Sequence, residues 1–204
     1  ITVQYGNNKP TIEDFNLEIS SGEIVAIVGE SGSGKTTVIR SVLGLLPGQG
    51  KVTKGDIVFE GDSLLKYTDK QWNQCRGTKM SMIFQDPMTS LNPTMTIGKQ
   101  IMEPIMKHQG CSKAEAKAKA EELITLFGIS EAAKRMKQYP HQFSGGMRQR
   151  IVIAIALACN PRVLICDEPT TALDVTIQAQ ILELIKDLQQ KTNVAVIFIT
   201  HDLG

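Results

Sequence analysis

The sequence lacks any apolar run long enough to cross a bilayer. Its longest uninterrupted run, Ile151 to Cys159, falls far short of the roughly 20 residues that a membrane-spanning helix needs. The sequence also has no large excess of one charge sign, because it contains 22 basic and 21 acidic residues and its formal net charge is +1. No overall positive field therefore exists to gather nucleic acid or anionic lipid, and we expect no nucleic-acid partner.

Paired cysteines are missing as well. None of the cysteines forms a C-x-x-C pair, which fits free thiols in a reducing compartment better than a disulfide or zinc framework. The cysteines are Cys75, Cys111, Cys159 and Cys166. We therefore expect a cytoplasmic setting. Signal peptides, repeats and linkers are absent, so residues 1–204 are expected to form one compact unit. The chain opens without methionine and stops at Gly204 directly after an apolar run, so we expect both ends to be cut.

What the sequence does contain is a glycine-rich phosphate loop. The pattern G-x-x-x-x-G-K-[ST] is met by Gly29-Glu30-Ser31-Gly32-Ser33-Gly34-Lys35-Thr36-Thr37, directly after the apolar run Ile24–Val28. Glycines let backbone N–H groups face a β-phosphate, Lys35 neutralises the β- and γ-oxygens, and Thr36 offers its hydroxyl to Mg²⁺. A helix expected over Thr37–Leu46 points its positive end at the same anion. The predicted nucleotide-binding residues here are Gly29, Ser31, Gly32, Ser33, Gly34, Lys35, Thr36 and Thr37.

Short apolar runs predict a parallel sheet covered by helices on both faces. These runs are Ile24–Val28, Met80–Phe84, Val163–Cys166 and Val194–Thr200. Three further segments predict an antiparallel layer near the start, namely Ile1–Tyr5, Phe15–Ile19 and Ile57–Glu60.

Between Gln85 and Pro161 the pattern becomes helical. Ser112 and Glu115 form a capping box that begins a helix expected to run to Phe127. We therefore predict an α/β fold: a P-loop NTPase with a mostly parallel central sheet, an N-terminal antiparallel β layer and an inserted α-helical subdomain. The core would comprise residues 1–85 and 162–204, and the helical subdomain residues 86–161.

Two carboxylates follow a predicted strand. Asp167 and Glu168 come directly after Val163–Cys166, at the strand end where ligands of open α/β sheets bind. Beside a phosphate loop, Asp167 would hold Mg²⁺ through its water shell. Glu168 would orient and deprotonate the attacking water.

A second anion cradle lies in the run Phe143-Ser144-Gly145-Gly146-Met147-Arg148-Gln149-Arg150. Ser144 caps a helix, and Gly145 and Gly146 expose backbone N–H groups. Here the chain resembles the ATP-binding-cassette (ABC) ATPases, whose signature is a Ser-Gly-Gly turn after a bulky apolar residue and before a helix. The resemblance covers essentially all 204 residues.

This resemblance implies roles for residues that would carry no signal alone. Tyr5 would stack on adenine, Gln85 would link the Mg²⁺ and water site to the helical subdomain, and His201 would touch the γ-phosphate. The loop Thr171-Ala172-Leu173-Asp174 would signal between two sites. The implied cofactors are ATP and Mg²⁺. The resemblance implies four catalytic residues, Glu168, His201, Gln85 and Lys35. The implied magnesium ligands are Thr36, Gln85 and Asp167. Five further residues would bind nucleotide, namely Tyr5, Ser144, Gly145, Gly146 and Asp174.

Three residues depart from the commonest family pattern. Met147 replaces the usual glutamine after Ser-Gly-Gly, Thr171 replaces serine, and Cys166 occupies an aliphatic strand position. Met147 removes one amide near a partner's nucleotide, although the backbone N–H groups of the turn remain. Cys166 is expected to pack as a small hydrophobic side chain.

A narrower resemblance is carried by Gln85-Asp86-Pro87-Met88-Thr89-Ser90-Leu91-Asn92-Pro93 and Tyr139-Pro140-His141-Gln142. These runs are similar to the ATPase subunits of dipeptide, oligopeptide and nickel importers. The resemblance implies a peripheral subunit on the cytoplasmic face of the membrane, docked on two permeases that an extracytoplasmic solute-binding protein feeds. The segment from Gln85 to Pro104 is interpreted as a surface loop that receives a permease helix.

The mechanism expected from this resemblance is head-to-tail association with a second ATPase subunit, identical or homologous. One subunit's phosphate loop binds MgATP, the Ser144–Gly146 turn of the other closes on the γ-phosphate, and hydrolysis separates them. The alternatives are ABC ATPases of non-transport classes. A DNA-repair or chromosome-maintenance head has long heptad-rich arms that are absent between Thr36 and Phe143, and a ribosome-associated protein carries two cassettes where one is visible here.

Overall fold

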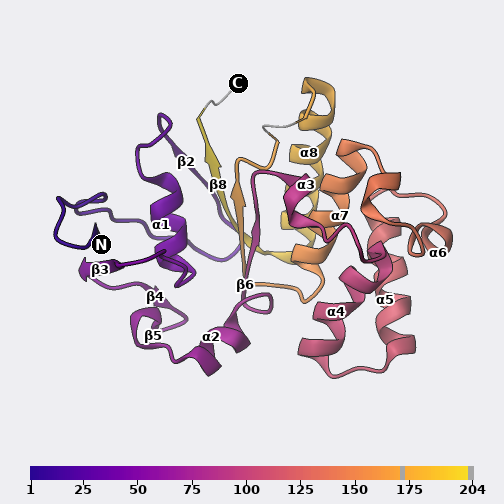
Figure 1. Cartoon of the computed structure of the whole chain (residues 1–204), viewed down its shortest axis with the longest axis horizontal. Helices are drawn as coiled ribbons and strands as arrows, with labels where there is room; N and C mark the ends of the chain where they lie inside the picture. The colour runs from indigo at the N-terminus through magenta and orange to yellow at the C-terminus, as the bar shows by residue number, and fades with distance from the viewer. Residues whose placement is uncertain (171–172, 202–204) are drawn as a thin grey trace.

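A parallel sheet of four strands runs through the middle of the molecule (Figure 1). The structure, a computed structural model, describes residues 1–170 and 173–201. The strand order is β2-β8-β7-β6, and every neighbouring pair is parallel. The strands are β2 (Ile24–Val28), β6 (Met80–Ile83), β7 (Val163–Asp167) and β8 (Ala195–Thr200). The predicted parallel sheet is confirmed. Its predicted cover on both faces is wrong at the edge strand β2, where Ile24 and Val28 are 43% and 44% exposed.

Strand β7 shows why its sequence is continuously apolar. Leu164 and Cys166 point into the core shared with the helices of the second half of the chain, whereas Ile165 points into the core that contains Ile39 of helix α1 (Lys35–Val42). Both faces are therefore buried, and no polar alternation is possible. Cys166 is fully buried, and burial raises the pKa of its thiol, so it packs as the small hydrophobic side chain that we predicted.

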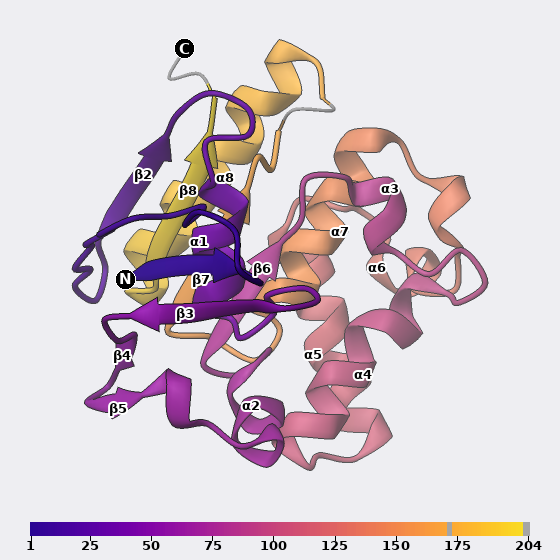
Figure 2. The same cartoon turned by 60° about the vertical axis from the view of Figure 1, so that its left-hand side comes forward.

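The N-terminal antiparallel layer is formed by β1 (Thr2–Tyr5) and β3 (Gly50–Lys54), which lie together in front of α1 in Figure 2. The prediction missed β3, because Val52 is its only large apolar residue. A separate small hairpin joins β4 (Val58–Phe59) to β5 (Asp62–Ser63), so the segment predicted over Ile57–Glu60 is a shorter strand outside the main layer.

The strand predicted over Phe15–Ile19 is wrong. Asp14 has a φ of 51°, which turns the chain, and the Phe15 N–H donates to Ile1 O before the segment leaves β1. Phe15 and Ile19 instead contribute their side chains to the hydrophobic clusters without a ladder of backbone hydrogen bonds. Their apolar alternation therefore reflects side-chain packing.

The helices between β6 and β7 gather on one side of the sheet (Figure 1). Helix α5 begins at the predicted capping box: the Ser112 N–H donates to Glu115 Oε2 (2.8 Å) and the Glu115 N–H to Ser112 Oγ (3.3 Å). No helix among the described residues is both long and apolar enough to span a membrane. The helices are α2 (Asp69–Cys75), α3 (Pro87–Ser90), α4 (Ile97–Gln109), α5 (Lys113–Leu126), α6 (Ala132–Arg135), α7 (Gly145–Leu157) and α8 (Val175–Thr192), with short 3₁₀ turns at Leu64–Lys66 and Pro140–Gln142.

The loop predicted from Gln85 to Pro104 is wrong over its second half, where α4 begins at Ile97. Ile97, Ile101 and Ile105 are fully buried at a helical spacing of four. Burying one such side chain contributes roughly 1.5–3 kcal/mol, so three outweigh the roughly 3 kcal/mol that a proline inside a helix costs. Pro104 is therefore accommodated within α4.

The helix predicted over Thr37–Leu46 begins two residues earlier and ends at Val42, because Gly44 has a φ of +62°. A Cβ at Gly44 would lie 2.6 Å from two ring atoms of Trp72. The Arg76 guanidinium carbon lies 4.6 Å from the centre of that ring, and Arg76 also donates to Leu43 O and Gly44 O, both at 2.9 Å. The Trp72 ring is thus held in place against the end of α1.

We expect Gly44→Ala to destabilise the protein more than Gly48→Ala does. Both glycines have positive φ, but a Cβ at Gly48 meets nothing within 4 Å, so Gly48→Ala reports the backbone strain alone. The additional overpacking against Trp72 should lower the free energy of unfolding by about 1–3 kcal/mol. Urea denaturation of both variants measures the difference, and equal losses would contradict the proposed contact.

Candidate functional site

The phosphate loop connects β2 to α1. Gly32 and Gly34 have φ values of +80° and +95°, which other residues rarely adopt. Gly34 is the N-cap of α1 and supplies no side-chain cap, so the first N–H groups of the helix are available to an anion. Lys35 is only 8% exposed, and its Nζ donates to Gly29 O (2.5 Å) and Glu30 O (2.8 Å). The ammonium group therefore lies within the loop.

A cavity of about 470 Å³ opens beside this loop. Its volume is within the range of small-molecule sites. The lining joins the loop to the ends of β6, β7 and β8, and consists of Thr11, Ser31, Gly32, Gly34, Lys35, Thr36, Thr37, Gln85, Glu168 and His201. Four segments far apart in the sequence that we predicted to act together thus meet at one cavity.

A carboxylate, an amide and an imidazole form a cluster at the cavity. Gln85 Nε2 donates to Glu168 Oε2 at 2.9 Å, and His201 Nδ1 lies 3.5 Å from the same oxygen. Glu168 has a φ of 47°, a left-handed conformation that costs energy and persists only where its surroundings enforce it. Its backbone N–H donates to Ile199 O (3.0 Å), which ties it to β8.

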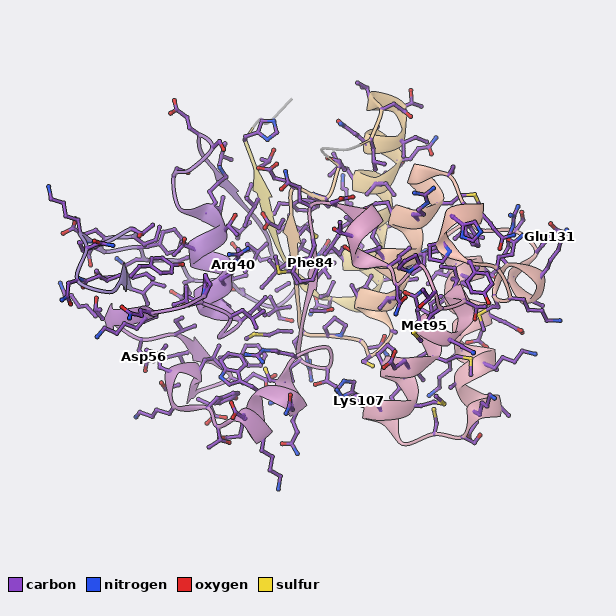
Figure 3. All side chains as sticks on the ribbon, viewed as in Figure 1. Arg40, Asp56, Phe84, Met95, Lys107 and Glu131 are labelled. Atoms are coloured by element: carbon purple, nitrogen blue, oxygen red, sulfur yellow. The ribbon has the colours of Figure 1, made fainter. Side chains whose placement is uncertain are left out.

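Gln85 lies at the boundary between the sheet and the helical side. Phe84, the residue before it, is about half exposed, and Figure 3 labels it near the centre of the view, between Arg40 and Met95. Gln85 lines the cavity, and α3 begins two residues after it. Its role as the link between the magnesium site and the helical subdomain stays a prediction.

The oxygen donors suit a magnesium ion. Asp167 ends β7, and burial together with the neighbouring Glu168 raises the pKa of its carboxyl, while Arg40 and Lys35 oppose that shift. The Thr36 hydroxyl, the Gln85 amide oxygen and the Asp167 carboxylate are the hard ligands that Mg²⁺ prefers. The described residues contain no group of three or more His, Cys, Asp or Glu side chains placed to hold a metal. Asp167 does not line the cavity itself.

The second cradle lies apart from this cavity. Ser144 caps α7 by accepting from the Met147 N–H at 3.4 Å, and neither it nor the two following glycines line the cavity. A Cβ at Gly146 would lie 2.9 Å from Ile177 Cγ2, so the close approach of α7 to α8 requires glycine there. The chain therefore presents two separate helix N-termini that are suited to anions.

Some predicted residues are placed elsewhere. Tyr5 ends β1 and does not line the cavity; nor do Gly29 and Ser33. Asp174 Oδ1 accepts from the Ile177 N–H at 3.0 Å and caps α8. Thr171 and Ala172 of the predicted signalling loop lie outside the described residues. The nucleotide-binding roles of Tyr5 and Asp174 stay predictions.

Sequence reasoning missed Thr11, the lining residue from the N-terminal region. Its N–H donates to Val3 O at 2.9 Å, and the neighbouring Ile12 packs against Gly34, where a Cβ would lie 2.3 Å from Ile12 Cδ1. These contacts hold Thr11 against the phosphate loop. Nothing in the local sequence around Thr11 indicates that position.

Comparison with known proteins agrees with this geometry. The chain is 56% identical over 201 residues to the "Oligopeptide transport ATP-binding protein OppD" of Bacillus subtilis (strain 168), covering 98% of this chain and 56% of that protein. It is 54% identical over 201 residues to the "Dipeptide transport ATP-binding protein DppD" of the same organism, covering 98% of this chain and 60% of that protein. The chain thus spans less than two thirds of the length of these curated relatives.

Solved structures share the fold. The "Dimeric structure of a post-hydrolysis state of the ATP-binding cassette MJ0796 bound to ADP and Pi" matches with a TM-score of 0.82 and 32% identity, over 99% of this chain and 85% of that one. The structure of cbiO1 from Clostridium perfringens, described as "part of the ABC transporter complex cbiONQ", matches with a TM-score of 0.84 and 26% identity, over 98% of this chain and 76% of that one. The predicted P-loop NTPase fold is confirmed.

The family model described as "ABC transporter" matches residues 12–171. That span contains the phosphate loop, Gln85, the Ser144 turn, Asp167 and Glu168. This chain therefore belongs to the ABC transporter family.

Proposed function

We propose that this chain binds ATP with Mg²⁺ and hydrolyses it to ADP and phosphate, as the ATPase unit of an importer for peptides. The observation that carries the proposal is the cavity in which Gln85, Glu168 and His201 face the phosphate loop. The similarity to peptide-transport ATP-binding proteins supports the choice of solute, and favours peptides over nickel.

In this proposal the phosphate loop binds the nucleotide. The N–H groups at the start of α1 donate to phosphate oxygens, and Lys35 exchanges its contacts with Gly29 O and Glu30 O for the β- and γ-phosphates. Mg²⁺, when bound, neutralises charge that develops on the phosphate oxygens. Thr36, Gln85 and Asp167 would hold this ion, Asp167 through its water shell. Tyr5 stacks on the adenine from the end of β1.

Glu168 acts as the general base. Its carboxylate accepts a proton from the attacking water while the water oxygen forms the new bond to the γ-phosphorus. The bond between that phosphorus and the β,γ-bridging oxygen breaks, and ADP leaves with the electron pair. Gln85 donates to Oε2 of this carboxylate and thereby orients it. His201, beside that oxygen, orients toward the γ-phosphate.

The second cradle serves a partner subunit. Ser144, Gly145 and Gly146 do not line the chain's own cavity, so their N–H groups are free to close on a nucleotide held by another ATPase subunit. The solved structure of MJ0796 is dimeric, which supports the pairing of two ATPase subunits, and we propose that they pair head to tail. We place the core at residues 1–85 and 162–204 and the helical subdomain at residues 86–161.

The proposed assembly sits at the cytoplasmic face of the membrane. Two permease subunits receive the ATPase pair, and an extracytoplasmic solute-binding protein delivers the peptide. Phe84, exposed beside Gln85, and the segment up to α4 provide the surface on which a permease segment would act.

Uptake by whole cells tests this function. We expect deletion of the gene to abolish uptake of a labelled oligopeptide, and the wild-type gene to restore it. Purified protein should release phosphate from ATP with Mg²⁺ and stop when EDTA is added. If the deletion strain lost only nickel uptake, the transported solute would be nickel. If it took up both the oligopeptide and nickel normally, the proposal that the chain serves an importer would be contradicted.

A further inference from the structure

Gln149 is a fully buried polar residue in α7 that the proposed chemistry has not used. Its Nε2 donates to the carbonyl oxygen of Pro169 at 2.6 Å. Pro169 directly follows Glu168, the proposed general base. A side chain of α7 is therefore hydrogen-bonded to the backbone next to the carboxylate of the proposed general base.

The segment after Glu168 is also held from its other side. Gln178 of α8 donates through Nε2 to Thr170 O (3.0 Å) and Leu173 O (2.9 Å). Two glutamine amides, one from α7 and one from α8, thus bond to the described backbone on either side of positions 171–172.

The same helix carries the second cradle. Gln149 lies little more than one helical turn after Ser144, and a Cβ at Gly145 would lie 3.7 Å from Leu173 Cδ2. Because a hydrogen-bonded helix moves nearly as a rigid body, a displacement of the Ser144 turn is carried to the Gln149 amide and from there to Pro169.

The choice of glutamine is costly for stability. Gln149 Oε1 is buried and has no hydrogen-bond partner among the described residues. Leaving a buried acceptor unsatisfied destabilises a fold, so an apolar side chain of similar length would suit packing better. The donor on Nε2 is the feature that an apolar side chain lacks.

We propose that Gln149 is a positioning residue that ties the Ser144 turn to the catalytic base. Its bond to Pro169 O holds the backbone after Glu168, so that the carboxylate reaches its hydrolytic position when a partner's nucleotide closes on Ser144. The inference rests on the proposed ATPase function. It also accounts for the left-handed φ of Glu168, which needs support from its surroundings.

The test compares two glutamine-to-methionine variants in the purified protein. Gln149→Met removes the donor but keeps the length of the side chain. Gln109→Met is the matched control, because Gln109 Nε2 also donates to a backbone carbonyl, Ala158 O at 3.1 Å, away from the cavity. We expect Gln149→Met to lower kcat for ATP roughly 10- to 100-fold, as for a misplaced catalytic group, and to leave KM within about twofold. Gln109→Met should retain the wild-type kcat.

A second measurement separates positioning from structure. The double variant Glu168→Gln, Gln149→Met should dimerise at the same MgATP and protein concentrations as Glu168→Gln alone, because the Ser144 cradle is intact. Gln149→Asn, which has an amide of shorter reach, serves the same comparison if the methionine variant does not fold.

Three results would overturn the inference. An unchanged kcat in Gln149→Met while the wild type is active overturns it alone. Weakened dimerisation that accompanies the loss of kcat assigns Gln149 a structural role and also overturns it. A wild-type protein without ATPase activity overturns the proposed function together with the inference.

Discussion

Replacing Glu168 by glutamine is expected to leave MgATP binding intact and to lower turnover roughly 10² to 10⁴-fold, the usual contribution of a positioned general base. The amide keeps the shape of the side chain and its place beside Gln85 and His201, but it does not accept a proton from water. ATP should therefore accumulate unhydrolysed between two subunits. Phosphate release measures the turnover, and light scattering with and without MgATP detects the dimer.

Glu183→Gln is the control for this variant. Glu183 is an exposed residue of α8 outside the cavity lining, so the same loss of charge there should leave turnover unchanged. Normal turnover in Glu168→Gln would assign the base to another residue. A variant that binds ATP but stays monomeric would mean that closure needs a different ATPase subunit.

Lys35→Ala is expected to weaken nucleotide binding itself. Lys35 is the buried cation of the phosphate loop, and its Nζ already lies beside the loop carbonyls. Removing a charged hydrogen-bond partner costs about 1.5–3 kcal/mol, which corresponds to a roughly 10- to 100-fold loss of ATP affinity. Calorimetric titration with MgATP measures the affinity directly.

Lys113→Ala provides the matched control, because Lys113 is exposed at the start of α5 and far from the phosphate loop in the chain. Its affinity for ATP should equal that of the wild type. An unaltered affinity in Lys35→Ala would contradict the assignment of the loop, on which the whole proposed site depends.

The elements predicted correctly are those with strong local signals. The central strands β7 and β8 are continuous apolar runs because both of their faces are buried, and α5 is marked by its capping box. The edge strand β2 is equally apolar, although Ile24 and Val28 are exposed. Strand β3 has one large apolar residue and depends on pairing with β1, so its signal is not local. Helix α4 was missed because Pro104 argues against a helix locally, while the burial of its isoleucines is a property of the folded core.

The same distinction holds for the site. The phosphate loop and the two carboxylates are recognisable because their residue types stand at fixed spacings beside an apolar strand. Thr11 reaches the cavity only because Val3 and Gly34 hold its segment there, and Gln149 meets Pro169 only because α7 packs against β6, the neighbour of β7 in the sheet. Neither residue belongs to a pattern that spacing reveals.

By itself, the sequence determined the parallel sheet, the phosphate loop and the residue types of its chemistry, because these depend on apolar periodicity and on short-range spacing. The tertiary structure alone decided that Gln85, Glu168 and His201 share one oxygen-centred cluster, that Ser144 lies outside the cavity, and that Gln149 is bonded beside the base. The physical reason is that these contacts join residues from separate strands and helices, and only the packing of those elements brings them within hydrogen-bonding distance.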